Sequence, residues 1–300
     1  MRGQLWDRMT FGPWRRRRWM LRQLRRLDEL DAREARAAAD RRRPRRSVAQ
    51  PFRTAVVVCA TTAIVVVGLG VLLHREYGLT LTADGLRGPT PLSRPPEVTP
   101  GVGSHAFAMT QPGDESRPVT YSPCREVAVV VNDALAPPGS AGLVEEALAE
   151  VSAATGLRLV LEGTTDEPAA ERRELRIPER YGDRWAPALV AWTTPEQVPG
   201  LRGDVAGLGG SSAFELGVLG RLRYVSGTVH LDAPAMATIL ARPDGRDLAR
   251  AVVMHELGHL VGLDHVDDPR ELMYADNVGV TGFGPGDREG LAALGSGDCL

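Results

Sequence analysis

Residues 255–265 decide how this sequence is interpreted, and they read His255-Glu256-Leu257-Gly258-His259-Leu260-Val261-Gly262-Leu263-Asp264-His265. If the stretch begins as a helix, His255 and His259 lie one turn apart on the same face, so both imidazoles can bind one ion. Gly262 lacks a Cβ and can turn the chain sharply where the helix ends, which returns His265 to a third ligand position. Three imidazoles with a fourth corner left for water are typical of a catalytic zinc site.

Glu256 follows the first of these histidines, so its carboxylate lies beside the predicted metal without being a ligand. That is the position from which a general base takes a proton from zinc-bound water. The pattern therefore predicts a hydrolase that holds one Zn²⁺ and uses Glu256 as its catalytic residue. The alternative is a polar helix face, but the glycine and third histidine at fixed offsets argue against it.

The extended motif resembles that of the metzincin metallopeptidases. This family has a methionine turn beneath the zinc, and the segment from Glu271 to Asp276 supplies one with Met273 at its centre. An ordinary core methionine fits the same residue, since the family's methionine packs under the ligands and does not bind the ion. The short spacing from His265 to Met273 looks most like the matrixin branch.

The resemblance covers residues 104–300 and implies an α+β domain, a mixed twisted sheet with the zinc-binding helix against it, that cleaves peptide bonds as an endopeptidase. Two departures are visible. Val266 stands where matrixins usually have serine, and Ser211 and Ser212 stand where a structural zinc would need a histidine. We therefore predict no second zinc and interpret His230 as an ordinary strand residue. The sequence does not indicate whether calcium binds.

The near-neutral net charge of −2 hides a division of the chain. Residues 1–53 carry 17 arginines and 6 acidic residues, whereas the remaining 247 carry 19 arginines and 32 acidic residues. Between the two parts, residues 54–73 read TAVVVCATTAIVVVGLGVLL, an uncharged run long enough to cross a bilayer as a helix. A signal peptide or buried helix fits less well, because 53 residues precede the run and no small-residue cleavage site follows it.

The arginines before this span set the expected topology. The positive-inside rule places the N-terminus in the cytoplasm and residues 74–300 outside, in a single-pass protein of the cell membrane. Arginine clusters with Trp6, Trp14 and Trp19 favour binding to anionic lipid headgroups, while nucleic-acid binding is the less favoured alternative for residues 1–53. This segment is expected to be partly helical, and self-association of its helix is an open alternative.

The rest of the chain divides into a linker and a domain. Residues 74–103 are rich in proline and glycine and are expected to form an extracellular tether. The domain should contain strands at 126–131, 157–161, 186–192 and 224–231, and helices between Ser140 and Gly156, from Asp244 to Gly262 and from Asp287 to Gly295. The Gly-rich residues 207–212 are assigned no helix or strand.

Of three cysteines, Cys59 falls in the predicted span, while Cys124 and Cys299 bracket the domain. An oxidising exterior favours a disulfide between them, with a stabilisation of about 4 kcal/mol for so long a loop. A free thiol that blocks the zinc and pairing with a second chain are the alternatives.

Three functions remain open. The first is a membrane-anchored extracellular zinc endopeptidase in which Glu256 deprotonates the water and protonates the leaving amine. The second is a catalytically silent, zinc-stabilised binding domain, and the third is a membrane scaffold acting through its basic tail.

Overall fold

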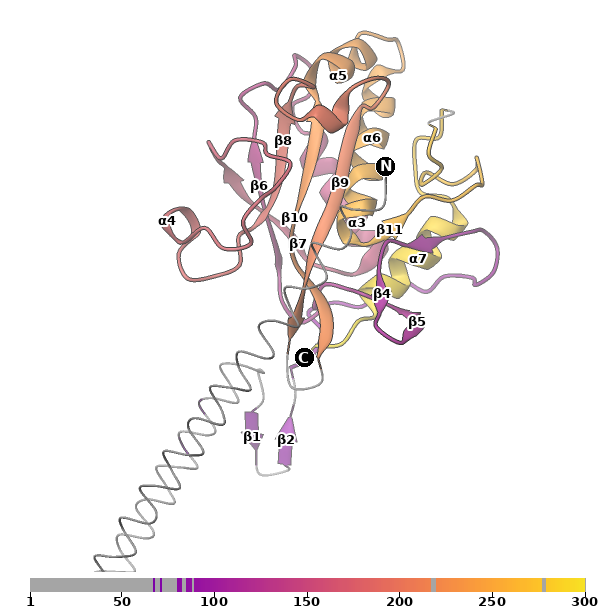
Figure 1. Ribbon diagram of the computed structural model, residues 1–300. Helices are drawn as coiled ribbons and strands as arrows, with labels where there is room; N and C mark the ends of the chain where they lie inside the picture. Colours follow the sequence, from indigo (N-terminus) through magenta and orange to yellow (C-terminus); the bar gives the residue numbers. More distant parts are fainter. Residues whose placement is uncertain are drawn as a thin grey trace, which may run out of the picture. The chain divides into compact units, whose positions relative to one another are not determined.

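The structure is a computed structural model, and it describes residues 67, 71, 80–82, 85–87, 89–216, 220–276 and 279–299 (Figure 1). The chain divides into the units Met1–Val65 and Val66–Leu300, and all the described residues belong to the second. The predicted membrane span, 54–73, lies outside the described residues apart from Val67 and Val71. Within the described part of the chain, no helix is both long and apolar enough to cross a membrane.

A five-stranded mixed sheet forms the centre of the domain. Its order is β7 (Leu159–Thr164), β6 (Val127–Asn132), β8 (Ala188–Thr193), β10 (Arg221–Asp232) and β9 (Gly207–Leu216). The first four strands are parallel, and β9 pairs antiparallel with β10 and forms one edge. The mixed sheet predicted from the sequence is therefore confirmed.

Three helices cover one face of this sheet. Helices α3 (Leu143–Thr155), α6 (Gly245–Val261) and α7 (Pro285–Gly295) pack against one another, and α6 also contacts β9 and β10 (Figure 1). The main core lies between them and alternate residues of the central strands, such as Val129, Val190 and Val229. Gly156 ends α3 in the left-handed conformation that its position after the last apolar residue predicts.

The opposite face of the sheet also carries a small core. Val130, Leu189 and Ala191 are buried there beneath Ala169 and Tyr181, which come from the long connection that contains α4 (Pro178–Tyr181). Because both faces are covered, β6 and β8 are apolar along their length and do not alternate with polar residues.

Short elements complete the domain. The helix α5 (Ala233–Leu240) leads into α6, and η1 (Pro199–Leu201) precedes β9. Three two-stranded sheets are formed by β1 (Thr80–Thr82) with β2 (Gly85–Arg87), β4 (Thr110–Gln111) with β5 (Asp114–Pro118), and β3 (Ala106–Phe107) with β11 (Leu263–Asp264).

The range predicted as a tether contains ordered contacts with the domain. The Leu92 N–H donates to the Pro123 carbonyl at 2.9 Å, and the backbone at Arg94 lies against Gly156. Residues 89–103 thus contact the domain before residue 104, where we expected it to begin.

Candidate metal and active site

The end of helix α6 brings the three histidines together. His255 and His259 lie on its last two turns, and the helix ends at Gly262, whose φ of 122° few other residues adopt. A Cβ at Gly262 would also lie 2.9 Å from the Tyr224 ring, so the tight turn leaves room only for glycine. The chain then reverses through β11 and delivers His265.

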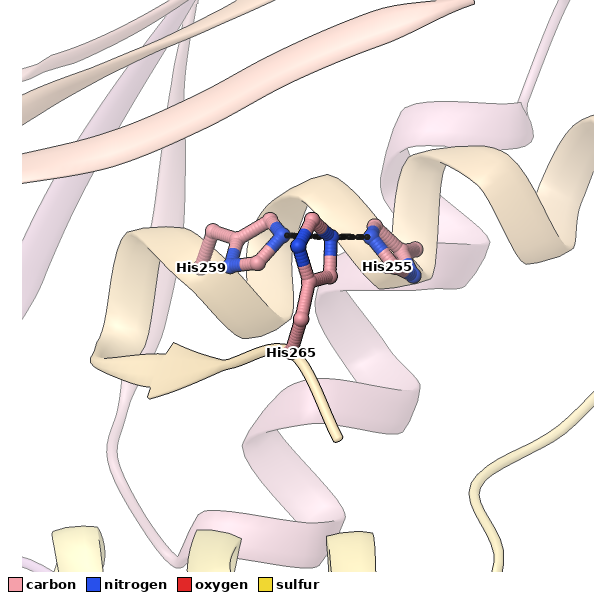
Figure 2. Close-up of side chains that lie close together, drawn as sticks. All are labelled: His255, His259 and His265. Atoms are coloured by element: carbon pink, nitrogen blue, oxygen red, sulfur yellow. Dashed lines mark hydrogen bonds between the residues drawn. The ribbon is translucent and has the colours of Figure 1, made fainter. Parts of the chain in front are cut away.

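The three Nε2 atoms form an equilateral triangle. Each pair, His255 with His259, His255 with His265 and His259 with His265, is separated by 3.1 Å (Figure 2). His255 Nδ1 donates to the Leu272 carbonyl at 2.7 Å, and His259 Nδ1 donates to the Leu263 carbonyl at 2.9 Å. These carbonyls can only accept, so each Nδ1 carries the proton and each Nε2 presents a lone pair.

This donor set fits a zinc ion. Burial lowers the pKa of His255 to about 4 and also lowers that of His259, so both rings are neutral at pH 7. Neutral rings whose lone pairs converge repel one another unless a cation lies among them. The nitrogen ligands of tetrahedral zinc lie about 3.3 Å apart, given Zn–N bonds of about 2.0–2.1 Å, so the triangle has nearly the required size.

Glu256, on α6, is 6% exposed, and its side chain lies against the edge strand β9. Burial raises the pKa of its carboxyl to about 8, and a hydrogen bond from the Gly209 backbone opposes this shift. A cation bound by the adjacent histidines would also favour the ionised form. A Cβ at Gly207 would lie 2.6 Å from Glu256 Cγ, and one at Gly209 would lie 2.1 Å from the Glu256 carbonyl oxygen. The glycines of β9 therefore allow the strand to approach the predicted general base.

Met273 lies directly beneath the helix that carries the histidines. It is 1% exposed, and its Sδ lies 2.7 Å from the position of a Cβ built on Gly258. The Met273 carbonyl accepts a hydrogen bond from the Val266 N–H at 3.1 Å, which ties the methionine turn to the residue after His265. Leu272, one residue earlier, supplies the carbonyl that orients His255.

Two buried carboxylates hold this turn against α7. Asp287 accepts hydrogen bonds from the backbone N–H groups of Leu272 (2.6 Å), Met273 (3.3 Å) and Gly284 (3.0 Å). Glu271 accepts from the N–H groups of Gly286 and Asp287, both at 3.0 Å. We call this reciprocal pair, Glu271 and Asp287, the carboxylate clamp. Burial raises the pKa of Asp287 to about 6 despite these donors.

A groove of about 640 Å³ lies beside His265. Its walls are formed by residues 265–270, by Ala275, and by Ser104 and Ala106 from the segment at β3. Asp268 pairs with Arg270 within this wall, at 2.7 Å between Oδ2 and Nη2. The groove gives a bound molecule access to the third histidine.

The predicted disulfide is present. Cys124 and Cys299 are bonded, with Cα atoms 5.2 Å apart and a sequence separation of 175. Neither thiol is thus free to block the histidines, while Cys59 lies outside the described residues.

His230, on strand β10, does not belong to the group of three histidines. It is 4% exposed in β10, and its Nε2 has no hydrogen-bond partner within the described part of the chain. Burial lowers its pKa, and the nearby Arg173 contributes in the same direction. Arg173 itself forms a buried, bidentate ion pair with Glu167, which also accepts a hydrogen bond from the Tyr181 hydroxyl.

Sequence reasoning did not identify the carboxylate clamp or the contacts of Gly207 and Gly209. The signals were present but weak: an acidic residue beside Leu272, a Pro-Gly-Asp sequence at α7, and alternate glycines before β10. None of these specifies its partner, because the contacts join segments distant in sequence.

Comparison with known proteins supports the chemistry of this site. The sequence model of the matrixin family matches residues 209–281, which include the three histidines, Glu256 and Met273. No curated protein matches the chain significantly. Among solved structures, archaemetzincin from Methanopyrus kandleri is similar, with a TM-score of 0.36 and 17% identity over 55% of this chain and 92% of that one. The matrixin match points to a zinc metallopeptidase of the metzincin type.

Proposed function

We propose that this protein is a zinc-dependent endopeptidase in which His255, His259 and His265 hold the metal and Glu256 is the general base. The observation that carries the proposal is the 3.1 Å triangle of Nε2 atoms, oriented by two backbone carbonyls and flanked by a buried carboxylate. When bound, zinc would polarise the scissile carbonyl and acidify a water molecule.

The chain's own residues then perform the proton transfers. Glu256 takes a proton from the attacking water and passes it to the leaving amine, so one carboxylate serves both steps. Its burial keeps bulk water from competing for the proton, and Gly209 donates a hydrogen bond to its carboxylate. Met273 and the carboxylate clamp keep the helix and the methionine turn in a fixed relation beneath the histidines.

A peptide would bind in extended form along β9. This strand is an edge of the sheet, so one side of its backbone is available to pair with an added strand. Its Gly207 and Gly209 lie against Glu256, so a peptide on this edge passes next to the general base. The groove beside His265 would take substrate side chains.

The decisive test uses the purified full-length chain. The wild type should contain about one zinc per chain and cleave an internally quenched peptide library, and a chelator should abolish the cleavage. Glu256→Ala should keep the zinc and lose about 10²–10⁴-fold in kcat/KM, the usual contribution of a positioned general base. Glu179→Ala, at an exposed position on α4, is the control and should retain full activity.

Other results would decide for another function. Zinc binding without cleavage of any peptide would favour a zinc-stabilised binding domain. Capture of partners that depends on residues 1–53 and is unaffected by Glu256→Ala would favour a scaffold.

We also propose that the peptidase is anchored in the cell membrane by residues 54–73, with its catalytic domain outside and residues 1–53 on anionic headgroups. The uncharged run, the arginines before it and a disulfide in the domain support this arrangement. The chain should stay in membranes under alkaline carbonate extraction. External protease should remove a C-terminal tag but not an N-terminal one, and the reverse pattern would refute the topology.

A further inference from the structure

The segment from Gly101 to Ala108, which we call the strap, crosses from α7 to the turn that delivers His265. At its start, the Gly101 N–H donates to Glu289 Oε2 at 2.8 Å. At its end, β3 pairs with β11, with Phe107 opposite Leu263 and Ala106 opposite Asp264. The Ala108 N–H then donates to the Gly262 carbonyl at 2.9 Å, at the glycine that ends α6.

The middle of the strap packs on the carboxylate clamp. A Cβ at Gly103 would lie 2.1 Å from Glu271 Oε1 and 2.3 Å from the Gly286 backbone nitrogen. These two atoms form one of the hydrogen bonds of the clamp, so the strap backbone lies directly over it. The contact is also close from the other side, because a Cβ at Gly286 would lie 2.2 Å from the Ser104 carbonyl oxygen.

His265 depends on this support more than the other two histidines do. His255 and His259 project from a 17-residue helix that has its own hydrogen bonds. His265 instead follows the two-residue strand β11, and β3 of the strap is the strand paired with it. At the turn, the Gly262 N–H donates to carbonyls of its own helix, α6, and the Gly262 carbonyl accepts a hydrogen bond from the Ala108 N–H of the strap.

We infer that the strap is a positioning element for the third metal ligand, so that its docking on β11 and the carboxylate clamp sets how tightly the site binds zinc. This inference rests on the proposed zinc site but not on peptide cleavage. The strap precedes the histidine motif by about 150 residues in the sequence. Its loss would widen the histidine triangle at His265 and leave the pair on α6 in place.

The test compares two proline variants of the full-length chain. Ala108→Pro removes the N–H that bonds to Gly262, at an exposed side chain. Met109→Pro is the matched control, because Met109 is 38% exposed and its N–H has no backbone partner among the described residues. The zinc dissociation constant is measured by competition with a chromophoric chelator, and the absorption spectrum of the cobalt-loaded chain reports the coordination geometry.

We expect Ala108→Pro to raise the zinc dissociation constant by about two- to tenfold, the effect of one net backbone hydrogen bond. Its cobalt spectrum should shift, whereas Met109→Pro should match the wild type in both measurements. The melting temperature of the metal-free chain should be alike in the two variants. A lower melting temperature in Ala108→Pro with an unchanged cobalt spectrum would instead indicate a purely structural role of the strap.

A second pair of variants tests the middle of the strap. Gly103→Ala should raise the dissociation constant by about tenfold or more, because its Cβ forces the strap away from the clamp. Gly282→Ala, where a Cβ meets nothing within 4 Å, should leave it unchanged. Wild-type affinity and an unchanged spectrum in both Ala108→Pro and Gly103→Ala would overturn the inference. A wild type that binds zinc but cleaves no peptide would refute the proposed peptidase, and the strap would still stand on the zinc measurements.

Discussion

At the scale of single residues, the site is organised by backbone groups that orient side chains. The Leu272 and Leu263 carbonyls fix which nitrogen of His255 and His259 is protonated, so both rings can present a lone pair. Leu272 is in turn held by Asp287, which lies in α7. A histidine of the site is thus positioned through a chain of two hydrogen bonds that ends on a buried carboxylate.

Replacing Asp287 should therefore weaken both the fold and the site. Asp287→Asn keeps the shape but places an amide near three backbone N–H donors, and we expect a loss of about 1–3 kcal/mol in unfolding free energy. Zinc affinity should fall with it. Denaturant unfolding and chelator competition measure the two effects, with the exposed Asp267→Asn as a control expected to stay within about 0.5 kcal/mol of the wild type. Wild-type stability in Asp287→Asn would mean that the clamp contributes little.

The buried ion pair of Glu167 and Arg173 predicts a pH dependence of stability. Burial opposes ionisation of Glu167, but the hydrogen bonds from Arg173 and Tyr181 outweigh it, so its pKa is lowered in the folded chain. A lowered folded pKa contributes stability that is present above the unfolded value of about 4.3 and is lost as the pH falls through the folded pKa.

Glu167→Gln should accordingly flatten the acid side of the stability profile. Unfolding free energies measured from pH 7 to pH 3 should fall less steeply in the variant, although it is less stable at pH 7 by about 3–5 kcal/mol because Arg173 loses its partner. The exposed Glu196→Gln serves as a comparison for a carboxyl outside this network. Parallel profiles for the wild type and Glu167→Gln would remove this ion pair as a source of the pH dependence.

At the scale of elements, β9 is a strand that the sequence did not predict. Residues 207–212 contain Gly207, Gly209 and Gly210 followed by two serines, a composition that disfavours strands. The structure places them in a ten-residue strand, because β10 pairs with it and α6 approaches it too closely for side chains at alternate positions. The strand was missed because the reason for these glycines, the close approach of Glu256, lies about 50 residues away in the sequence.

The two faces of β9 should respond differently to a methyl group. Gly209→Ala would place Cβ 2.1 Å from the Glu256 carbonyl oxygen, so we expect a loss of about 1–3 kcal/mol in stability and a large fall in kcat/KM. Gly210→Ala meets nothing within 4 Å and should be neutral. Thermal unfolding and peptide cleavage of the two variants make the comparison, and equal behaviour would show that β9 does not position Glu256.

Other elements were more readable from local signals. The three histidines and Gly262 lie within 11 residues, so helix geometry and a turn at the glycine predicted that the histidines gather, whereas the place of Met273 was predicted from the resemblance to the metzincins. The start of α6 after Asp244 was also predicted, whereas α7 begins at Pro285 and not at Asp287. Proline at the first helical position is permitted there, and the carboxylate of Asp287 bonds back to Gly284 from the third position.

At the scale of the whole molecule, the disulfide closes a loop that contains almost the entire sheet and the histidine site. It joins Cys124, just before β6, to Cys299, just after α7. The first strand of the central sheet and the last helix are therefore covalently linked, and the intervening 175-residue separation limits the freedom of the unfolded chain.

Removing this bond should lower stability without removing the site. We expect the double variant Cys124→Ser/Cys299→Ser to lose about 2–5 kcal/mol in unfolding free energy, while zinc content remains near one per chain. The two single variants control for a free thiol. Loss of zinc in the double variant at temperatures where it is folded would show that the bond shapes the site as well.

The strap also determines how the domain would respond to mechanical load. A pull applied to the chain on the N-terminal side is borne first by the contacts of Leu92 with Pro123 and of Arg94 with Gly156. It then reaches Gly101 and the two-residue ladder of β3 and β11 before it reaches β6 in the central sheet. So short a ladder would separate under forces that leave the sheet intact. Once the contacts at Leu92 and Arg94 have separated, tension on the chain would therefore reach the histidine triangle before the strands of the central sheet.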